Sequence, residues 1–262
     1  MSLSASPPLL YRYRPASGQN FDRLRKMIVE GEYYFAAPGS LNDPFDCRPI
    51  YRLGSNDDAA KQYLQYLFSK FEPNVPEKER SAQIEQLLTN PDSDPRRPEN
   101  QQFLAAAISI LGIDRIGVLC LSASDRTPLM WAHYAESHSG VCLGFDSSMQ
   151  PLARAFPVQY SNTRPIVDLT VDNHKQALIK TLYSKSNDWC HEQEWRLCDD
   201  LHGPGIHLIP TSALRQIILG FKAPHDLLRE VLAWTRNYPS PIEIHRVRKS
   251  MTNFEFEIQR YK

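Results

Sequence analysis

The sequence predicts an α+β fold with a mixed, mostly antiparallel sheet as its core and a helical insertion. Many short apolar or alternating stretches, which are typical of strands, are spread along the chain with helical stretches between them. The end of the chain, PIEIHRVRKS followed by FEFEIQR, alternates apolar and polar residues like an antiparallel pair with one solvated face. From about residue 52 to residue 112 the apolar residues instead follow helical spacing. We therefore expect a single domain over residues 1–262 that carries a helical insertion.

The first part of the chain predicts a strand, a helix and a second strand. LLYRYR alternates aromatic and basic residues before Pro15, as a short strand does. Asn20 is expected to cap a helix over FDRLRKMIVE, and Gly31 is expected to end it. EYYFAAP then reads as a strand rich in aromatic residues, which Pro38 and Gly39 end.

The insertion and the second half of the chain contain the remaining predicted elements. Loop compositions, EPNVP and NPDSDPRRP, separate three helical stretches of the insertion. Thr127 and Pro128 are expected to open a short helix over PLMWAHYAE, because proline suits the first helical position. Two further helices are expected over DNHKQALIKTLYSK and HDLLREVLAWTRN, and strands over IGVLCLS, VCLGFD, PVQYS, EWRLC, GIHLIP and QIILGF.

Composition excludes some classes of protein. Lysine plus arginine and aspartate plus glutamate each number 30, so the net charge of zero argues against nucleic-acid binding through bulk electrostatics. No segment approaches the roughly 20 apolar residues that cross a bilayer, so no membrane partner is expected. The start, MSLSASPPLL, lacks the features of a signal peptide, and the five cysteines form no C-x-x-C pair. We expect a cytoplasmic protein.

Two stretches carry polar or aromatic groups that have both a structural and a functional interpretation. LNDPFDC places Asn42, Asp43 and Asp46 in a tight turn, which either forms by local hydrogen bonding alone or presents polar groups to a cleft. In PLMWAHYAESHSG, Trp131 and Tyr134 share a helix face, which is either part of the core or a shelf for a cofactor. The spacing of the histidines there does not match a common metal site, and we assign no metal ligand.

The stretch CHEQEWRLC is the most informative. If it is extended, Glu192, Glu194 and Arg196 point to one side of a strand, where the arginine can bind a carboxylate through two hydrogen bonds. This pattern forms either a structural ion pair at a sheet edge or a functional acidic site. Arg12 and Arg14 near the start are either solvated or a clamp for a phosphate or carboxylate. The common glycine-rich nucleotide-binding motifs and the G-x-S-x-G hydrolase motif are absent from the sequence.

Four stretches, taken together, resemble a bacterial family known as domain of unknown function 2971. These stretches spread from about Leu10 to Phe221, and they are LYRYR, YYFAAPGSLNDPFDC, MWAHYAESHSGVCLGFD and KSNDWCHEQEWRL. The family's label implies little chemistry.

A second resemblance is to mono-ADP-ribosyltransferases, whose arginine-specific branch carries two glutamates one residue apart, as in Glu192-Gln193-Glu194. It implies NAD as the cofactor, Glu194 as the catalytic residue and Glu192 as the residue that orients a nucleophile. The Ser-Thr-Ser pattern of that group is absent here. Arg196 would orient or neutralise Glu194, and the residues implied to contact NAD are Arg12 or Arg14 at the pyrophosphate, Tyr34 or Trp131 at nicotinamide, and Ser40, Asn42 and Tyr134.

Three hypotheses about function follow. The first is an NAD-dependent mono-ADP-ribosyltransferase-like enzyme, a toxin or phage-defence effector that modifies an unknown macromolecular acceptor. The second is a non-catalytic protein-binding module of a defence or stress system, in which the acidic stretch forms structural ion pairs. The third is a metal-dependent nuclease that uses Asp43, Asp46, Glu192 and Glu194.

Overall fold

The computed structural model describes residues 6–54, 56–238 and 240–261. Its contacts divide the chain into two units. The first consists of Met1–Ala36, Gly117–Val158 and Asp188–Lys262, and the second of Ala37–Ile116 and Gln159–Asn187. The helical stretch between residues 52 and 112 therefore shares its unit with a later segment of the chain. The expectation of a single domain with an insertion stays a prediction.

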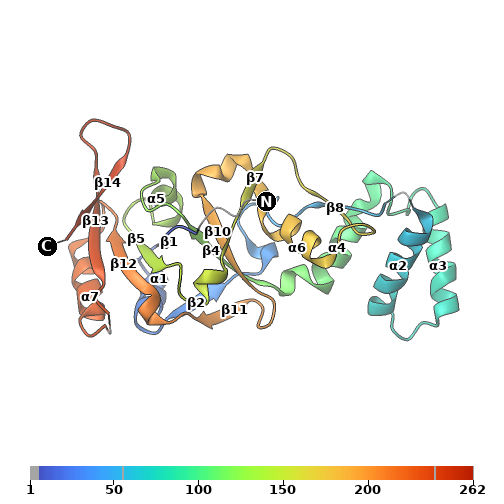
Figure 1. Ribbon diagram of the computed structural model, residues 1–262, viewed down its shortest axis with the longest axis horizontal. Helices are drawn as coiled ribbons and strands as arrows, with labels where there is room; N and C mark the ends of the chain where they lie inside the picture. The colour runs from blue at the N-terminus through green and yellow to red at the C-terminus, as the bar shows by residue number, and fades with distance from the viewer. Residues whose placement is uncertain (1–5, 55, 239, 262) are drawn as a thin grey trace. The chain divides into compact units, whose positions relative to one another are not determined.

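The first unit is built on a mixed sheet that has eight strands within the described residues (Figure 1). β12 and β13 run parallel, whereas the other neighbouring strands are antiparallel. The predicted α+β fold with a mostly antiparallel mixed sheet is therefore confirmed. From edge to edge the order is β14 (Phe256–Arg260), β13 (Glu243–Lys249), β12 (Leu214–Leu219), β5 (Val141–Asp146), β1 (Leu9–Arg14), β4 (Gly117–Ser122), β10 (Glu194–Asp199) and β6 (Phe156–Pro157).

Alternate residues of these strands face two separate hydrophobic clusters. Leu10, Leu143 and Trp195 belong to the larger cluster, to which the helices α1 (Gln19–Val29) and α7 (His225–Thr235) also contribute. Tyr13, Cys142 and Ile218 belong to the smaller cluster on the other face, together with Trp131 of helix α5 (Pro128–Tyr134). Because both faces are covered, polar side chains on the central strands are buried and need partners.

The ends of two helices test the capping predictions. Pro128 is the first residue of α5, as expected. Asn20 does not cap α1, because this helix already begins at Gln19 after Gly18, whose φ of 55° suits a residue without a side chain. The predicted cap was therefore wrong, and the helix begins at Gln19 instead of Phe21.

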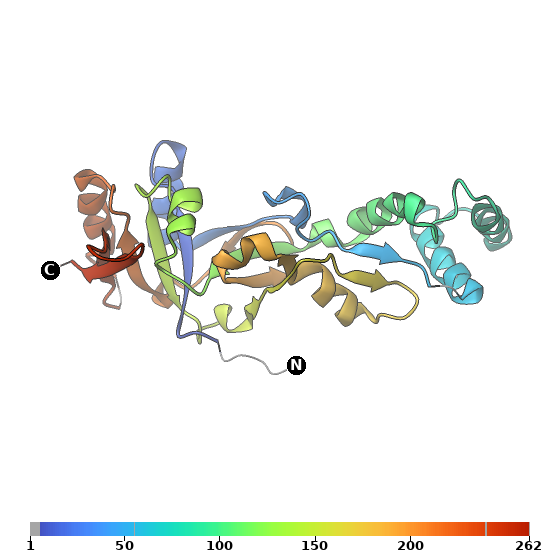
Figure 2. The same ribbon diagram turned by 90° about the horizontal axis from the view of Figure 1, so that it is seen from above.

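The second unit is mainly helical. The helices α2 (Asp57–Phe71) and α3 (Glu77–Thr89) contact each other (Figure 1 and Figure 2) and share a hydrophobic cluster with α4 (Gln101–Leu111). These helices lie where the sequence predicts helices. The same unit contains α6 (His174–Leu182) and two parallel pairs, of β3 (Ile50–Arg52) with β8 (Ile166–Asp168) and of β7 (Gln159–Ser161) with β9 (Ser184–Ser186).

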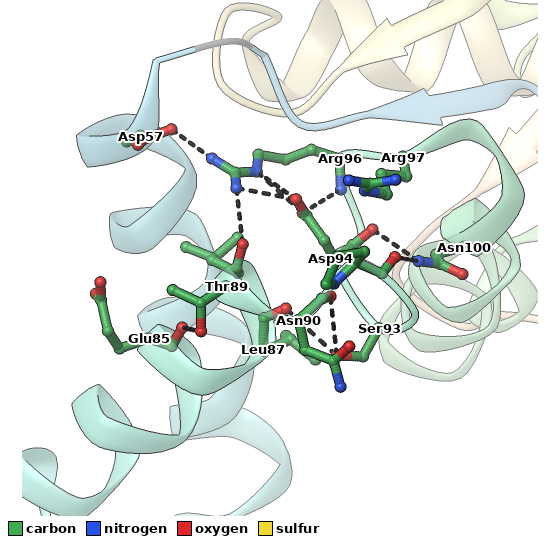
Figure 3. A network of polar contacts seen from close by, with 12 residues as sticks. Asp57, Glu85, Leu87, Thr89, Asn90, Ser93, Asp94, Arg96, Arg97 and Asn100 are labelled. Carbon is green, nitrogen blue, oxygen red and sulfur yellow. Dashed lines mark hydrogen bonds and ion pairs between the residues drawn. The ribbon is translucent and has the colours of Figure 1, made fainter.

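Arg96 fastens the loop after α3 through several polar contacts (Figure 3). Its Nε donates to Asp94 Oδ1 at 2.9 Å and its Nη2 donates to Asp94 Oδ2 at 2.9 Å. The same guanidinium donates to the carbonyl of Leu88 at 2.9 Å and pairs with Asp57 in the first turn of α2. One arginine thus ties the start of α2 to the end of α3.

The remaining elements are short. β2 (Glu32–Phe35) pairs with β11 (Gly205–Leu208) in the first unit. Within the described ranges, no helix has the length and apolar character needed to cross a membrane. The short 3₁₀ helices among the described residues are η1 (Pro38–Ser40), η2 (Pro98–Asn100), η3 (Ile113–Arg115), η4 (Leu152–Arg154), η5 (Asn187–Glu192) and η6 (Thr211–Ala213).

Candidate functional site

Glu194 and Arg196 form a buried ion pair on β10. Arg196 donates from Nε to Glu194 Oε1 at 2.8 Å and from Nη2 to Glu194 Oε2 at 2.9 Å. The side chain of Arg196 is 0% exposed and that of Glu194 is 3% exposed. The pair lies between β4 and β6, opposite Cys120 and Ser122 of β4 in the ladder. This arrangement corresponds to the bidentate pairing that the sequence suggested, in a fully buried setting.

Glu192 lies outside the strand. The chain forms the 3₁₀ helix η5 up to Glu192, and Gln193 has a φ of 45°, so β10 begins only at Glu194. The extended conformation considered for this stretch therefore applies from Glu194 onward. The hydroxyl of Tyr134 donates to Glu192 Oε1 at 2.6 Å, and Ser122 Oγ donates to the Glu192 carbonyl at 2.7 Å. A helix and a neighbouring strand thus hold Glu192, which is buried.

Tyr134, which donates to this carboxylate, belongs to a chain of neighbouring aromatic rings. We call Tyr134, His133, His191 and Trp189 the aromatic rim. The ring of His133 lies 6.3 Å from that of Tyr134 and 6.5 Å from that of His191, centroid to centroid. Trp189 lies 6.0 Å from His191. His133 is exposed and the other three residues are half-buried, so solvent reaches part of the rim.

Trp131 has no comparable access. It is 0% exposed, packs edge-on against Tyr13 at 5.2 Å, and donates from Nε1 to the carbonyl of Asp125 at 2.8 Å. Of the two interpretations that the sequence left open for Trp131, the structure places it in the core.

Arg12 and Arg14 lie on the other face of the sheet from Glu194. In the ladder they are opposite Leu143 and Val141, which belong to the larger hydrophobic cluster. Arg12 donates from Nη1 to the carbonyl of Cys120, and its buried Nε has no hydrogen-bond partner among the described residues. Burial, followed by the charges of Arg12 and Arg23, lowers the pKa of Arg14 to about 10. The positive charges of Arg12, Arg14 and Arg23 would together favour a bound anion.

Tyr11 and Tyr13 of β1 lie on the same face of the sheet as Glu194. Tyr11 is opposite Ser122, which is in turn opposite Glu194, so the three lie in one row across the sheet. Burial, with a smaller contribution from Asp125, raises the pKa of Tyr11 to about 12. Burial also raises the pKa of the Cys120 thiol, and the Glu194 charge raises it further. Tyr11, Cys120 and Ser122 were not among the predicted site residues, although the alternation in LYRYR already separates tyrosines from arginines.

The other predicted site residues are distributed over both units. Tyr34 is 57% exposed on β2 of the first unit. Ser40 and Asn42 belong to the second unit, where Ser40 Oγ donates to the carbonyl of Ala37 at 2.8 Å. Asp43 accepts a hydrogen bond from the N–H of Phe45 at 2.9 Å, as in a tight turn.

Asp46 of the same turn pairs with a lysine. Its Oδ2 lies 3.6 Å from Lys185 Nζ, and both side chains are buried. Asp43 and Asp46 belong to the second unit, whereas Glu192 and Glu194 belong to the first.

Comparison with known proteins supports one of the two resemblances. No curated protein and no solved structure matches the chain significantly, and no comparison supports a resemblance to the ADP-ribosyltransferase fold. The two stretches that carry Tyr134 and the Glu192–Arg196 segment lie within a family match. That family is described as a protein of unknown function (DUF2971), and its model matches residues 130–197.

Proposed function

We propose that the chain is an NAD-dependent ADP-ribosyltransferase in which Glu192 is the carboxylate at the reacting ribose. The observation that carries the proposal is the 2.6 Å hydrogen bond from Tyr134 to Glu192 within the aromatic rim. In this reaction the bond between C1′ of the ribose and nicotinamide breaks, and its electron pair leaves with nicotinamide. The acceptor's nucleophile then bonds to C1′ and loses a proton.

A buried carboxylate suits the charge that develops in this step. The ribose becomes oxocarbenium-like, and a fixed negative charge stabilises it more strongly in the transition state than in the ground state. Glu192 is held by Tyr134 and Ser122, so its orientation is set before substrate binds. The rings of His133 and His191 supply faces on which nicotinamide can stack.

Glu194 has a different role in this proposal from the one that the resemblance implies. Both of its oxygens accept hydrogen bonds from Arg196, whose charge neutralises it. Glu194 therefore serves as a positioning residue that fixes the start of β10 behind Glu192. Arg12 and Arg14 lie on the face of the sheet opposite to that of Glu194. Their predicted contact with the pyrophosphate stays a prediction.

The experiment measures nicotinamide release from NAD by chromatography, and transfer of labelled ADP-ribose to proteins of a bacterial lysate. Glu192→Gln should lower both by at least about 100-fold, the loss typical of removing an electrostatic group from a transition state. Glu230→Gln, an exposed change on α7, is the matched control and should behave as the wild type. If the wild type neither releases nicotinamide nor labels any protein, the proposal is wrong.

A non-catalytic binding module is the second candidate, and the burial of the Glu194–Arg196 pair favours it. Arg196 is 0% exposed and donates to both carboxylate oxygens of Glu194. Such a pair can have a purely structural role. Under this alternative no variant changes nicotinamide release, while Glu194→Gln lowers the melting temperature. The nuclease hypothesis stays a prediction, and a nuclease assay with and without a chelator tests it.

A further inference from the structure

Asp199, His202 and His207 bring one possible ligand atom each to a common point. Asp199 ends β10, His207 lies in β11, and His202 lies in the turn between these strands. The three ligand atoms all lie within 4.8 Å of one another. From these residues we propose that the chain binds one divalent transition-metal ion, with Zn²⁺ as the best fit, at a site separate from the aromatic rim.

The tautomer of His207 points to a cation. Its Nε2 lies 2.8 Å from the carbonyl oxygen of Gly203. A carbonyl oxygen only accepts, so Nε2 carries the proton in the neutral ring and Nδ1 carries a lone pair. That Nδ1 faces Asp199 Oδ2 at 3.4 Å. In this tautomer Nδ1 and Asp199 Oδ2 both present lone pairs toward the same point, as two ligands of one metal ion do.

The surroundings fix His207 in the manner of a metal ligand. A ligating histidine usually donates its other N–H to a backbone carbonyl or a carboxylate. Gly203 supplies that carbonyl, and its own oxygen lies so close to Gly117 that a Cβ there would meet it at 2.3 Å. The ring of His207 also stacks on Phe35 with centroids 4.2 Å apart. Its orientation is therefore set by backbone and by packing.

Hydrogen bonds also fix the orientation of the Asp199 carboxylate. Asp199 Oδ1 accepts hydrogen bonds from the N–H groups of Leu201 and His202, each at 2.9 Å. The other oxygen, Oδ2, lies 3.1 Å from His202 Nδ1. Bond lengths of about 2.0–2.2 Å from Zn²⁺ to nitrogen or oxygen put neighbouring ligands of a tetrahedral ion roughly 3.3 Å apart. The distances of 3.1 Å and 3.4 Å from Oδ2 to the two histidines match this spacing.

Three protein ligands leave a coordination position on the metal ion for water or substrate. Two histidines and one carboxylate are a known ligand set of catalytic zinc and of non-haem iron, with one or more positions left for water or substrate. All three residues also line a cleft of about 670 Å³, which Arg154 and Pro151 line as well. We infer that the open position of the metal ion faces this cleft.

The test is titration of the full chain, stripped with a chelator, with Zn²⁺ in a calorimeter and with Co²⁺ in a spectrophotometer. We expect one ion per chain and the visible absorption of Co²⁺ in a low-symmetry nitrogen and oxygen site. Removing a residue that only hydrogen-bonds to a metal ligand already weakens metal binding about 10–100-fold, so loss of a direct ligand in His202→Ala should weaken it by at least about 100-fold. The side chain of His202 is 73% exposed, so this variant should fold normally.

His225→Ala is the matched control, because His225 is an exposed histidine of the same unit at the start of α7. It should bind zinc as the wild type does. No stoichiometric binding by the wild type, or equal affinity in the wild type and His202→Ala, would overturn the proposal. In either case the three residues form a hydrogen-bonded cluster that does not bind a metal ion. Nicotinamide release is independent of these outcomes, so the two proposals fail or stand separately.

Discussion

Tyr134 and Glu192 are 58 positions apart in the chain, and the hydroxyl of the first donates to the carboxylate of the second at 2.6 Å. The bond joins the end of α5 to the segment that leads into β10. A short hydrogen bond to a buried carboxylate is among the stronger polar contacts of a protein. It therefore has consequences for stability as well as for the proposed reaction.

Tyr134→Phe should lower the free energy of unfolding by about 1–3 kcal/mol, because the change leaves a buried carboxylate oxygen without this donor. Urea denaturation measures the loss. Tyr34→Phe, at a 57% exposed position of the same unit, should change stability by less than about 0.5 kcal/mol. Equal stability of the two variants would show that the bond to Glu192 contributes nothing.

Arg196→Met should cost about 3–5 kcal/mol, because it leaves Glu194 buried without its counter-charge. The double variant Glu194→Leu/Arg196→Met removes both charges and should recover most of that loss. Urea denaturation of the two single variants and the double variant gives the coupling free energy. If the double variant is as unstable as the sum of the single ones, the two side chains do not act as a pair.

Asp94→Asn should destabilise the chain by about 1–3 kcal/mol at neutral pH, and the difference should vanish in acid. Burial alone would raise the pKa of Asp94, but hydrogen bonds from Arg96 outweigh it and lower the pKa. A carboxylate with a lowered pKa stabilises the fold above its ordinary pKa of about 3.9 and loses this effect as the pH falls through the folded-state value.

Unfolding curves of the wild type and Asp94→Asn between neutral pH and about pH 2.5 provide the measurement. The two proteins should converge at the acidic end. A difference that stays constant over the whole range would contradict the assignment to Asp94.

Gly220→Ala should cost about 1–3 kcal/mol, because the added Cβ would lie 2.0 Å from the carbonyl oxygen of His138. That atom belongs to the backbone and has no alternative rotamer. Gly112→Ala is the control, since a Cβ there meets nothing within 4 Å. Thermal unfolding should show a lower melting temperature for the first variant alone.

Elements with a strong local pattern could be predicted from the sequence. The apolar run of β4 and the alternation of β13 and β14 are sufficient to identify these strands, and Pro128 marks the start of α5. The same patterns give the α+β class, because they do not depend on how the strands pair.

The order of the strands and the contacts of the site could not be predicted in the same way. β1 lies between β5 and β4, and this arrangement puts Tyr11 rather than Arg12 in the row with Glu194. The left-handed backbone at Gln193 takes Glu192 out of the strand, although glutamine is not a residue that signals such a turn.

The metal-binding residues were missed for a related reason. Asp199 and His202 stand at positions i and i+3, a spacing that is common in helices and turns, and His207 follows in the next strand, so the spacing alone does not indicate a metal site. The pairing of β11 with β2 and the close approach of Gly203 to Gly117 help to hold this segment in place. These are contacts between distant parts of the chain, which local patterns do not encode.

The parallel pairing of β12 with β13 has a consequence for the edge of the sheet. α7 connects these two strands along the chain, and β13 and β14 lie beside β12 on the side away from β5. A chain cut after α7 would leave β12, most of whose side chains are buried, as an unprotected edge of unpaired N–H and C=O groups. Such a truncated chain should self-associate through that edge, and β13 and β14 therefore act as the cover that keeps it from doing so.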